Sequence, residues 1–166
     1  MEQVTTDILS IINRSTLKKA WHTVGTFHHH GINIPLFSIH SKDSCGIGEF
    51  LDLKLLFDFC VLTSMNIIQL LPLNDTGYET SPYNAISSQA LNPIYLSLHS
   101  LPFIKSDPSL QRDLQSFKKY SYLQKIAYNA VLSAKLDFLY TYYQKYFKNF
   151  SSLPIYKDFL LKNKWV

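Results

Sequence analysis

The sequence predicts an α/β fold in which one helix connects two parallel strands. Residues 31–39 form a short, near-continuous apolar run with polar neighbours on both sides, a pattern typical of a strand buried on both faces. Residues 66–73 form a second such run, which is followed by a turn-forming Asn-Asp-Thr-Gly segment. Between the two runs, apolar residues recur at helical spacings. A crossover helix between two strands favours their parallel pairing.

Helices are predicted on both sides of this unit as well as inside it. The apolar run that begins at Ile8 lacks a preceding basic region and a following cleavage site, so it indicates a helix rather than a signal peptide. The inner helix opens at Gly46-Ile47-Gly48-Glu49, where the glycines permit a turn and Glu49 suits a helix amino terminus. Its predicted apolar face consists of Phe50, Leu53, Phe57, Val61 and Leu62. Residues 114–150 predict a long amphipathic helix with an apolar face made by Tyr128, Val131, Leu132, Leu136, Leu139, Tyr143 and Phe147.

The composition indicates a globular, cytoplasmic protein. Hydrophobic residues make up 46% of the 166 residues and charged residues 17%, which excludes a disordered chain and allows one ordinary core. The longest apolar stretch, residues 59–73, is too short and too polar to span a bilayer. The two cysteines, Cys45 and Cys60, form no CxxC pair, as expected in a reducing compartment. The net charge of +4 comes from lysines spread singly along the second half, which indicates a solvated face.

The loop after the second strand carries the side chains that a sugar site needs. Parallel strands gather ligands beyond their carboxyl ends, and residues 74–98 follow such an end. Carboxylate, amide and hydroxyl groups there could bond sugar hydroxyls, and tyrosine rings could lie against the C–H face of a pyranose. The candidate residues are Asp75, Tyr78, Ser81, Tyr83, Asn84 and Asn92. The same pattern also fits a tyrosine-rich loop that packs on itself.

Six short pieces between residues 31 and 101 resemble, in order and spacing, the opening of the amylomaltase-type 4-α-glucanotransferases (disproportionating enzymes, glycoside hydrolase family 77). These pieces are Gly31-Ile32-Asn33-Ile34-Pro35-Leu36, Gly46-Ile47-Gly48-Glu49, Gln69-Leu70-Leu71-Pro72-Leu73, Thr76-Gly77-Tyr78, Ser81-Pro82-Tyr83 and Asn92-Pro93. The stretch 126–145 resembles the helical insert of that family, with Tyr128, Val131 and Lys135 at the recurring positions.

The resemblance implies a glycosyltransferase that moves α-1,4-glucan segments between maltooligosaccharides by a retaining, two-step mechanism. It implies that Ser81 and Tyr83 line the donor-sugar subsite and that Tyr78 lies at a second glucan site. It also implies the beginning of a (β/α)8 TIM barrel with helical insertions. On this basis we expect residues 1–30 to be an amino-terminal segment of helix and loop, and residues 31–101 to be the first βαβ part of the catalytic barrel with the substrate loop. Residues 102–166 would be a truncated helical insert.

The catalytic acids of the family have no recognisable counterpart in the sequence. A (β/α)8 barrel needs roughly 250 residues, so we expect an incomplete barrel and an amino-terminal fragment that is inactive alone. No catalytic residue is therefore assigned. We expect no cofactor and no membrane partner. The oligomeric state is left open.

Three other interpretations stay open at this point. A non-catalytic maltodextrin-binding remnant would have the same loop. A basic helical protein that binds nucleic acid would use the lysines interleaved with aromatic residues, namely Lys118, Lys119, Lys125, Lys135, Lys145 and Lys148. The run His28-His29-His30 suggests a metal site only weakly, because three adjacent side chains of a strand cannot all face one ion. We expect no metal there, and no nucleic-acid partner.

Overall fold

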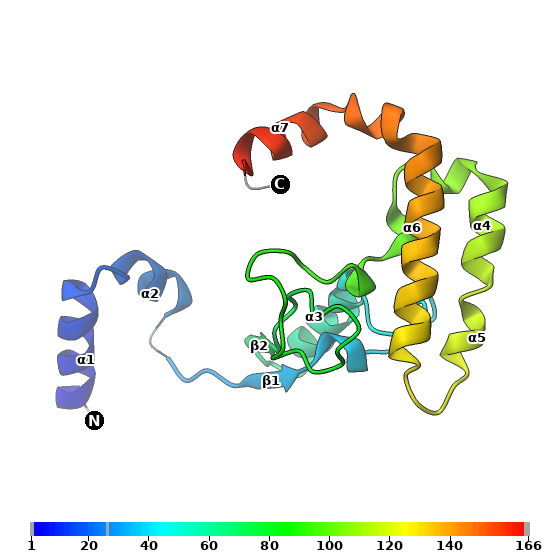
Figure 1. Cartoon of the computed structure of the whole chain (residues 1–166). Coiled ribbons are helices and arrows are strands. Elements are labelled where there is room, and N and C mark those ends of the chain that lie inside the picture. The colour runs from blue at the N-terminus through cyan, green and yellow to red at the C-terminus, as the bar shows by residue number, and fades with distance from the viewer. Residues whose placement is uncertain (1, 26, 165–166) are drawn as a thin grey trace.

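The computed structural model describes residues 2–25 and 27–164 of the chain. Figure 1 shows a helix pair at the amino terminus, a central strand-helix-strand unit and a helical group around one long helix. The helix pair consists of α1 (Glu2–Arg14) and α2 (Lys18–Val24). The central unit consists of β1 (Gly31–Ile34), α3 (Leu53–Leu62) and β2 (Ile67–Leu70). The helical group consists of α4 (Pro108–Gln115), α5 (Lys118–Ser121), α6 (Tyr128–Ser151) and α7 (Pro154–Lys162).

The predicted parallel pairing of the two strands is confirmed. Gly31 pairs with Ile67 and Ile34 with Leu70, in one two-stranded sheet among the described residues. Helix α3 lies between the strands in sequence and is preceded by a short 3-10 helix, η2 (Phe50–Asp52). The backbone approaches closely before this helix: a Cβ atom on Gly48 would lie 1.8 Å from the carbonyl oxygen of Leu36. The glycines of this segment are therefore required for a turn at Gly46 and for close packing at Gly48.

Two details of the predicted unit are wrong. The first strand ends at Ile34 instead of continuing to residue 39, because Pro35 has no amide hydrogen for the ladder and residues Leu36–Ser38 turn into a 3-10 helix, η1. Neither strand is buried on both faces, since exposed and half-buried residues alternate along each. In the same way, part of the predicted apolar face of α3 is exposed, including Val61 at 76% and Leu62 at 84%. No second layer of described residues covers these faces.

The chain between β2 and α4 is mostly loop and turn, with three short 3-10 helices in its second half. These are η3 (Pro93–Tyr95), η4 (Leu98–Ser100) and η5 (Ile104–Ser106). Ile94 and Leu98 in this stretch are fully buried. The stretch therefore supplies apolar side chains to the core although it contains no long element.

The predicted helix over residues 114–150 is interrupted. Helix α4 ends at Gln115, α5 is a single turn, and α6 begins only at Tyr128. The buried face of α6 also differs from the predicted one: Leu136, Tyr143 and Phe147 lie at the surface. The buried residues of α6 are Val131, Leu132, Lys135, Phe138 and Tyr142. A lysine at the centre of this face explains the error, because a hydropathy pattern assigns lysine to the solvent side.

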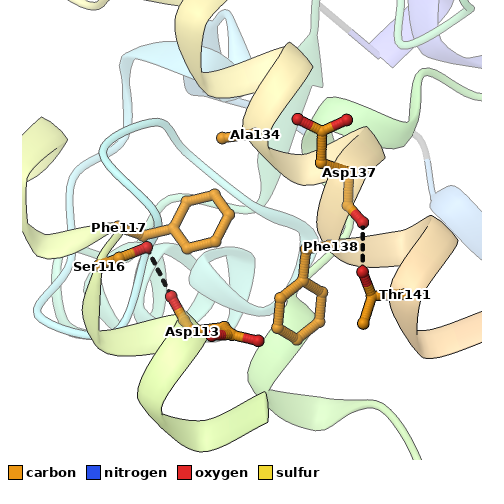
Figure 2. A pocket seen from close by; sticks show the side chains of 7 residues that line it. All are labelled: Asp113, Ser116, Phe117, Ala134, Asp137, Phe138 and Thr141. Atoms are coloured by element: carbon orange, nitrogen blue, oxygen red, sulfur yellow. Dashed lines mark hydrogen bonds between the residues drawn. The ribbon is translucent and has the colours of Figure 1, made fainter. Parts of the chain in front are cut away.

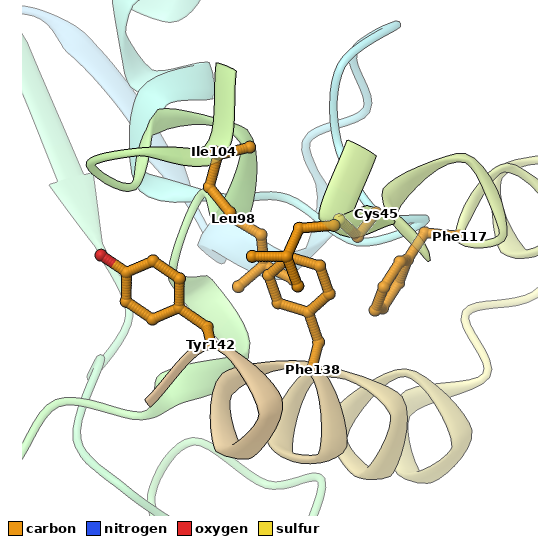
Figure 3. Close-up of a cluster of buried hydrophobic side chains, with 7 residues drawn as sticks. Cys45, Leu98, Ile104, Phe117, Phe138 and Tyr142 are labelled. Carbon is orange, nitrogen blue, oxygen red and sulfur yellow. The ribbon is translucent and has the colours of Figure 1, made fainter. Parts of the chain in front are cut away.

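Two apolar clusters form the core, and α6 contributes to both. The first brings Phe138 and Tyr142 of α6 against residues from five other segments of the chain. Figure 3 shows these side chains facing one another. Its members are Cys45, Leu98, Ile104, Leu110, Phe117, Phe138 and Tyr142. The second consists of Leu36, Ile47, Ile94, Tyr95, Val131 and Leu132. Because the second cluster includes residues that directly follow β1, it joins the helical group to the strand-helix-strand unit.

A buried ion pair lies between these clusters. The Nζ atom of Lys135 is 2.5 Å from Oε1 of Glu49, and both side chains are almost completely inaccessible to solvent. The same Nζ donates hydrogen bonds to the carbonyl oxygens of Ile94 at 2.6 Å and Leu96 at 2.9 Å. The three hydrogens of the ammonium group therefore have three acceptors. Oε1 of Glu49 also accepts the amide hydrogen of Cys45 at 3.2 Å.

A second polar cluster surrounds Asp107 at the amino terminus of α4. Its Oδ1 accepts the amide hydrogens of Ser109 and Leu110, and its Oδ2 accepts from Tyr146 at 2.8 Å and from Lys145 at 3.0 Å. Hydrogen bonds from Ser109 and then from Lys145 hold the pKa of the Asp107 carboxyl well below its usual range. The cap thus connects α4 to the carboxyl-terminal third of α6.

Removing the ammonium group of Lys135 should strongly destabilise the fold. In Lys135→Met the carboxylate of Glu49 stays buried without its counter-ion, so we expect the free energy of unfolding to fall by about 3–5 kcal/mol. Urea denaturation measures this value. Lys148→Met, an exposed change on the same helix, should shift it by less than about 0.5 kcal/mol. The double variant with Glu49→Leu should recover part of the loss, and equal effects of the two single lysine variants would contradict the role assigned to Lys135.

The contribution of Asp107 to stability should depend on pH. Because the folded-state pKa lies below the unfolded value of about 3.9, the stabilisation is fully present above the unfolded value. It begins to decrease as the pH falls towards that value, and it is lost completely only when the pH falls through the folded-state pKa. Asp107→Asn should therefore be less stable than the unmodified chain at pH 7, and the difference should narrow between pH 5 and pH 3. Urea denaturation at several pH values tests this. For Asp158→Asn, at an exposed i,i+4 pair, we expect little difference at any pH. If the stability difference between Asp107→Asn and the unmodified chain did not change with pH, the lowered pKa of Asp107 would not be its cause.

Candidate functional site

The loop after β2 is closed at its base by backbone hydrogen bonds. The amide of Asn92 donates to the carbonyl of Leu73 at 2.9 Å, and the amide of Asp75 donates to the carbonyl of Ala90 at 2.9 Å. An antiparallel bridge pairs Asn74 with Leu91 between these two contacts. Residues 74–92 are therefore a compact loop whose ends are held together, a form often used at binding sites. We call residues 74–92 the substrate loop.

The first half of the substrate loop is a tight turn that presents Tyr78. Oδ1 of Asp75 accepts the amide hydrogen of Gly77 at 2.8 Å, and Gly77 adopts a φ of 56°, in the left-handed region that glycine tolerates. The amide of Glu79 donates to the carbonyl of Thr76 at 3.1 Å. Tyr78 is 58% exposed, and its hydroxyl lies 3.4 Å from Oγ of Ser133 on α6. The turn places one side of this ring in solvent beside α6.

The second half presents Tyr83 in a similar way. The amide of Ser81 donates to Oε1 of Glu79 at 3.1 Å, and the amide of Asn84 donates to the carbonyl of Ser81 at 3.2 Å. Pro82 occupies the second position of this turn, where its fixed φ is favourable. Tyr83 is 69% exposed and Asn84 is exposed, whereas Ser81 is half-buried. Two tyrosine rings and neighbouring polar groups thus lie at the surface of one hydrogen-bonded loop.

Asn92 differs from the other predicted site residues because it is buried beneath the loop. It is 1% exposed, and its Oδ1 accepts the amide hydrogen of Ile94, which caps η3. Its Nδ2 donates to the hydroxyl of Tyr128 at 2.8 Å and to Oγ1 of Thr76 at 3.3 Å. Asn92 therefore supports the loop from the inside of the protein. Its side chain is not accessible for direct contact with a ligand in this structure.

Three residues that matter for this arrangement were not predicted as site residues. Tyr128 bonds the loop from α6, and Lys135 and Glu49 hold α6 itself in place. Tyr128 and Lys135 are seven residues apart, so both lie on the same face of a helix. That spacing is a sequence signal for a shared helix face, but a hydropathy pattern places a lysine on the solvent side and so hides it.

The basic residues do not form one uninterrupted surface. Of the six lysines considered for nucleic-acid binding, Lys135 is buried against Glu49, and Lys145 is paired with Asp107. Neither is therefore free to contact a phosphate without losing its present partner.

Neither cysteine has the environment of a nucleophile. Both are free and buried, and burial, followed by the charge of Glu49, raises the pKa of the Cys45 thiol far above its usual range. The thiol of Cys45 therefore stays protonated near neutral pH. Within residues 2–25 and 27–164, no group of three histidine, cysteine or acidic side chains is arranged to hold a metal ion. His29 instead lies with Nε2 3.3 Å from the carbonyl oxygen of Gly25.

A hollow of about 270 Å³ between α4 and α6 is separate from the substrate loop (Figure 2). Two carboxylates, Asp113 and Asp137, line it from the two helices. The hydroxyls beside them are occupied: Ser116 donates to the carbonyl of Asp113 and Thr141 to the carbonyl of Asp137. No residue of the substrate loop lines this hollow, so we do not assign it to the candidate site.

None of the helices in the described part of the chain is both long enough and apolar enough to cross a membrane.

Comparisons with known proteins identify the family of this chain. A protein-family model described as 4-alpha-glucanotransferase matches residues 34–166. The chain is 50% identical over 139 residues to a 4-alpha-glucanotransferase of Chlamydia pneumoniae. The matched region is 84% of this chain and 26% of that relative. It is 42% identical over 158 residues to a 4-alpha-glucanotransferase of Chlamydia muridarum. Here the matched region is 95% of this chain and 30% of that relative.

A plant protein is also similar. The 4-alpha-glucanotransferase DPE2 of Oryza sativa subsp. japonica is 34% identical over 140 residues, or 81% of this chain and 15% of the relative. The chain spans less than a third of the length of each of these three relatives. The family model covers most of the chain, including the substrate loop and α6, and the chain therefore belongs to the 4-alpha-glucanotransferase family.

Proposed function

We propose that this chain is the substrate-loop part of a 4-alpha-glucanotransferase and that residues 74–92 bind an α-1,4-linked glucan. The observation that carries the proposal is the exposure of Tyr78 and Tyr83 on one loop that is closed by hydrogen bonds at its base. A loop whose backbone is already held by hydrogen bonds loses little backbone entropy when a sugar binds to its rings. Membership of the family supports a glucan as the ligand.

We assign different roles to the two ends of the loop. Tyr83, Ser81 and Asn84 would contact the donor sugar, with the ring against its C–H face and the polar groups on its hydroxyls. Tyr78 would contact a second stretch of glucan next to α6. Asp75 and Asn92 would act indirectly, by holding the turn of the loop in position. Asp75 does so through the amide of Gly77, and Asn92 through Thr76 and Tyr128.

The chemical step would follow the retaining scheme that the family resemblance implies. A carboxylate attacks the anomeric carbon, a carboxylic acid protonates the leaving sugar oxygen, and a sugar hydroxyl then replaces water in the second displacement. The carboxylates of the loop do not suit these roles, because Asp75 and Glu79 already accept amide hydrogens from Gly77 and Ser81. We therefore assign substrate binding to these residues and no catalytic role.

The rest of the fold is part of the same proposal. The parallel β1-α3-β2 unit is the repeating unit of a (β/α)8 barrel, and the substrate loop follows the carboxyl end of a strand, where such barrels bind their substrates. We propose that residues 31–101 are the first part of such a barrel and residues 102–166 a helical insert. Residues 1–30 would be an amino-terminal segment outside it.

The chain should bind maltoheptaose through Tyr83. Isothermal titration calorimetry with the whole chain should detect binding, and Tyr83→Ala should weaken it by about threefold to tenfold, because the ring contact is lost. Tyr83→Phe keeps the ring and should retain most of the affinity. Tyr122→Ala, at a ring that is 83% exposed outside the loop, is the matched control and should have no effect. Unchanged affinity in Tyr83→Ala would mean that the donor site lies elsewhere.

We expect no glucan transfer by the 166 residues alone. The carboxylates of the loop are engaged with backbone amides, and no sequence motif corresponds to the catalytic acids of the family. Incubation with maltotriose, followed by chromatography of the sugars, measures the activity. Formation of glucose together with longer maltooligosaccharides would show that a catalytic pair is present in these residues. Binding without transfer is the result expected for a glucan-binding part of the enzyme.

A further inference from the structure

The hydroxyl of Tyr128 lies at the centre of a buried hydrogen-bond network under the substrate loop. It accepts a hydrogen bond from Nδ2 of Asn92 at 2.8 Å and lies 3.2 Å from Oγ1 of Thr76. Thr76 and Asn92 are 5% and 1% exposed. Tyr128 is the first residue of α6, so this network joins the two ends of the loop to the long helix.

The direction of each hydrogen bond follows from the number of available protons. The hydroxyl of Thr76 has one proton, and it is donated to the carbonyl of Glu79 at 2.7 Å. Thr76 can therefore only accept from Tyr128, and the phenol proton points to Oγ1 of Thr76. Nδ2 of Asn92 has two protons, which reach Tyr128 and Thr76. Every proton in the network has an acceptor, so the geometry of the network is fixed.

What the network orients is the turn that carries Tyr78. The hydroxyl of Thr76 holds the carbonyl of Glu79, and the amide of Glu79 returns to the carbonyl of Thr76. Tyr78 lies between these two residues and contacts Ser133 on α6. Without the phenol of Tyr128, one N–H of Asn92 would be buried and unpaired, and Oγ1 of Thr76 would accept a hydrogen bond only from Asn92. This loss favours a displaced or more mobile turn.

The ring of Tyr128 has a separate task. It packs against the second apolar cluster, beside residues such as Leu36 and Ile94. The ring therefore contributes to the core, whereas the hydroxyl contributes to the loop. The change Tyr128→Phe removes only the second contribution.

We propose that Tyr128 is a positioning residue that sets the orientation of Tyr78 for glucan binding, through Thr76 and Asn92. This inference rests on the proposed function for its ligand, but the effect on the loop is independent of it. Helix α6 thereby acts as the template against which the glucan-contacting turn is built.

The first test is amide hydrogen exchange in the whole chain, compared between the unmodified protein and Tyr128→Phe. We expect faster exchange, by about fivefold or more, at residues 76–81 and unchanged exchange in the interior of α6. Tyr140→Phe is the matched control, because Tyr140 is on the same helix and is 66% exposed. Equal exchange in residues 76–81 of both variants would overturn the proposal.

The second test is a double-mutant cycle with maltoheptaose. Tyr128→Phe should weaken binding by about threefold to tenfold, and this effect should disappear in a Tyr78→Ala background, because the turn then has no ring to orient. An equal loss in both backgrounds would show that Tyr128 acts on the fold in general and would overturn its link to Tyr78. If the unmodified chain did not bind maltoheptaose, the proposed function would fail, and the exchange experiment alone would decide the positioning role.

Discussion

The buried ammonium group of Lys135 is the contact on which the rest of the structure depends. It binds the carboxylate of Glu49, which precedes α3, and two carbonyl oxygens of the 3-10 stretch after the substrate loop. Glu49 is far from Ile94 and Leu96 in sequence, and Lys135 is far from all three, so only the correct packing of α6 brings one cation to these acceptors. A buried ion pair often contributes little net stability compared with apolar residues, but an unpaired member is costly. Any other placement of α6 would leave a buried charge unpaired and would therefore be higher in free energy.

The substrate loop depends on this placement. Tyr128 is seven residues before Lys135, on the same face of α6, and bonds Thr76 and Asn92 under the loop. Ser133 contacts the hydroxyl of Tyr78 from the same helix. The exposed rings of the loop are thus supported by an element far away in sequence. Loops supported by a rigid scaffold in this way are common at binding sites.

The division of labour among the tyrosines follows from burial. Tyr78 and Tyr83 have most of their surface in solvent and are available to a ligand, whereas the ring of Tyr128 contributes to a core cluster and its hydroxyl to a network. The same holds for the carboxylates: Asp75 and Glu79 are committed to the turns of the loop. The acids of the loop thus stabilise its turns, whereas the rings of Tyr78 and Tyr83 stay exposed.

The sequence by itself determined the α/β class, the parallel strand-helix-strand unit, the position of the loop after the second strand and the family, because these features are encoded in local periodicity and short motifs. It could place Tyr78 and Tyr83 on the loop, since Gly77 and Pro82 specify turns locally. Only the tertiary structure decided that Asn92 lies below the loop, that the helical pattern breaks before Tyr128, and that Lys135 is buried. The reason is physical: a lysine or an asparagine enters the interior only when distant partners satisfy its hydrogen bonds, and residues 49, 94 and 96 become partners of residue 135 only when the chain has folded.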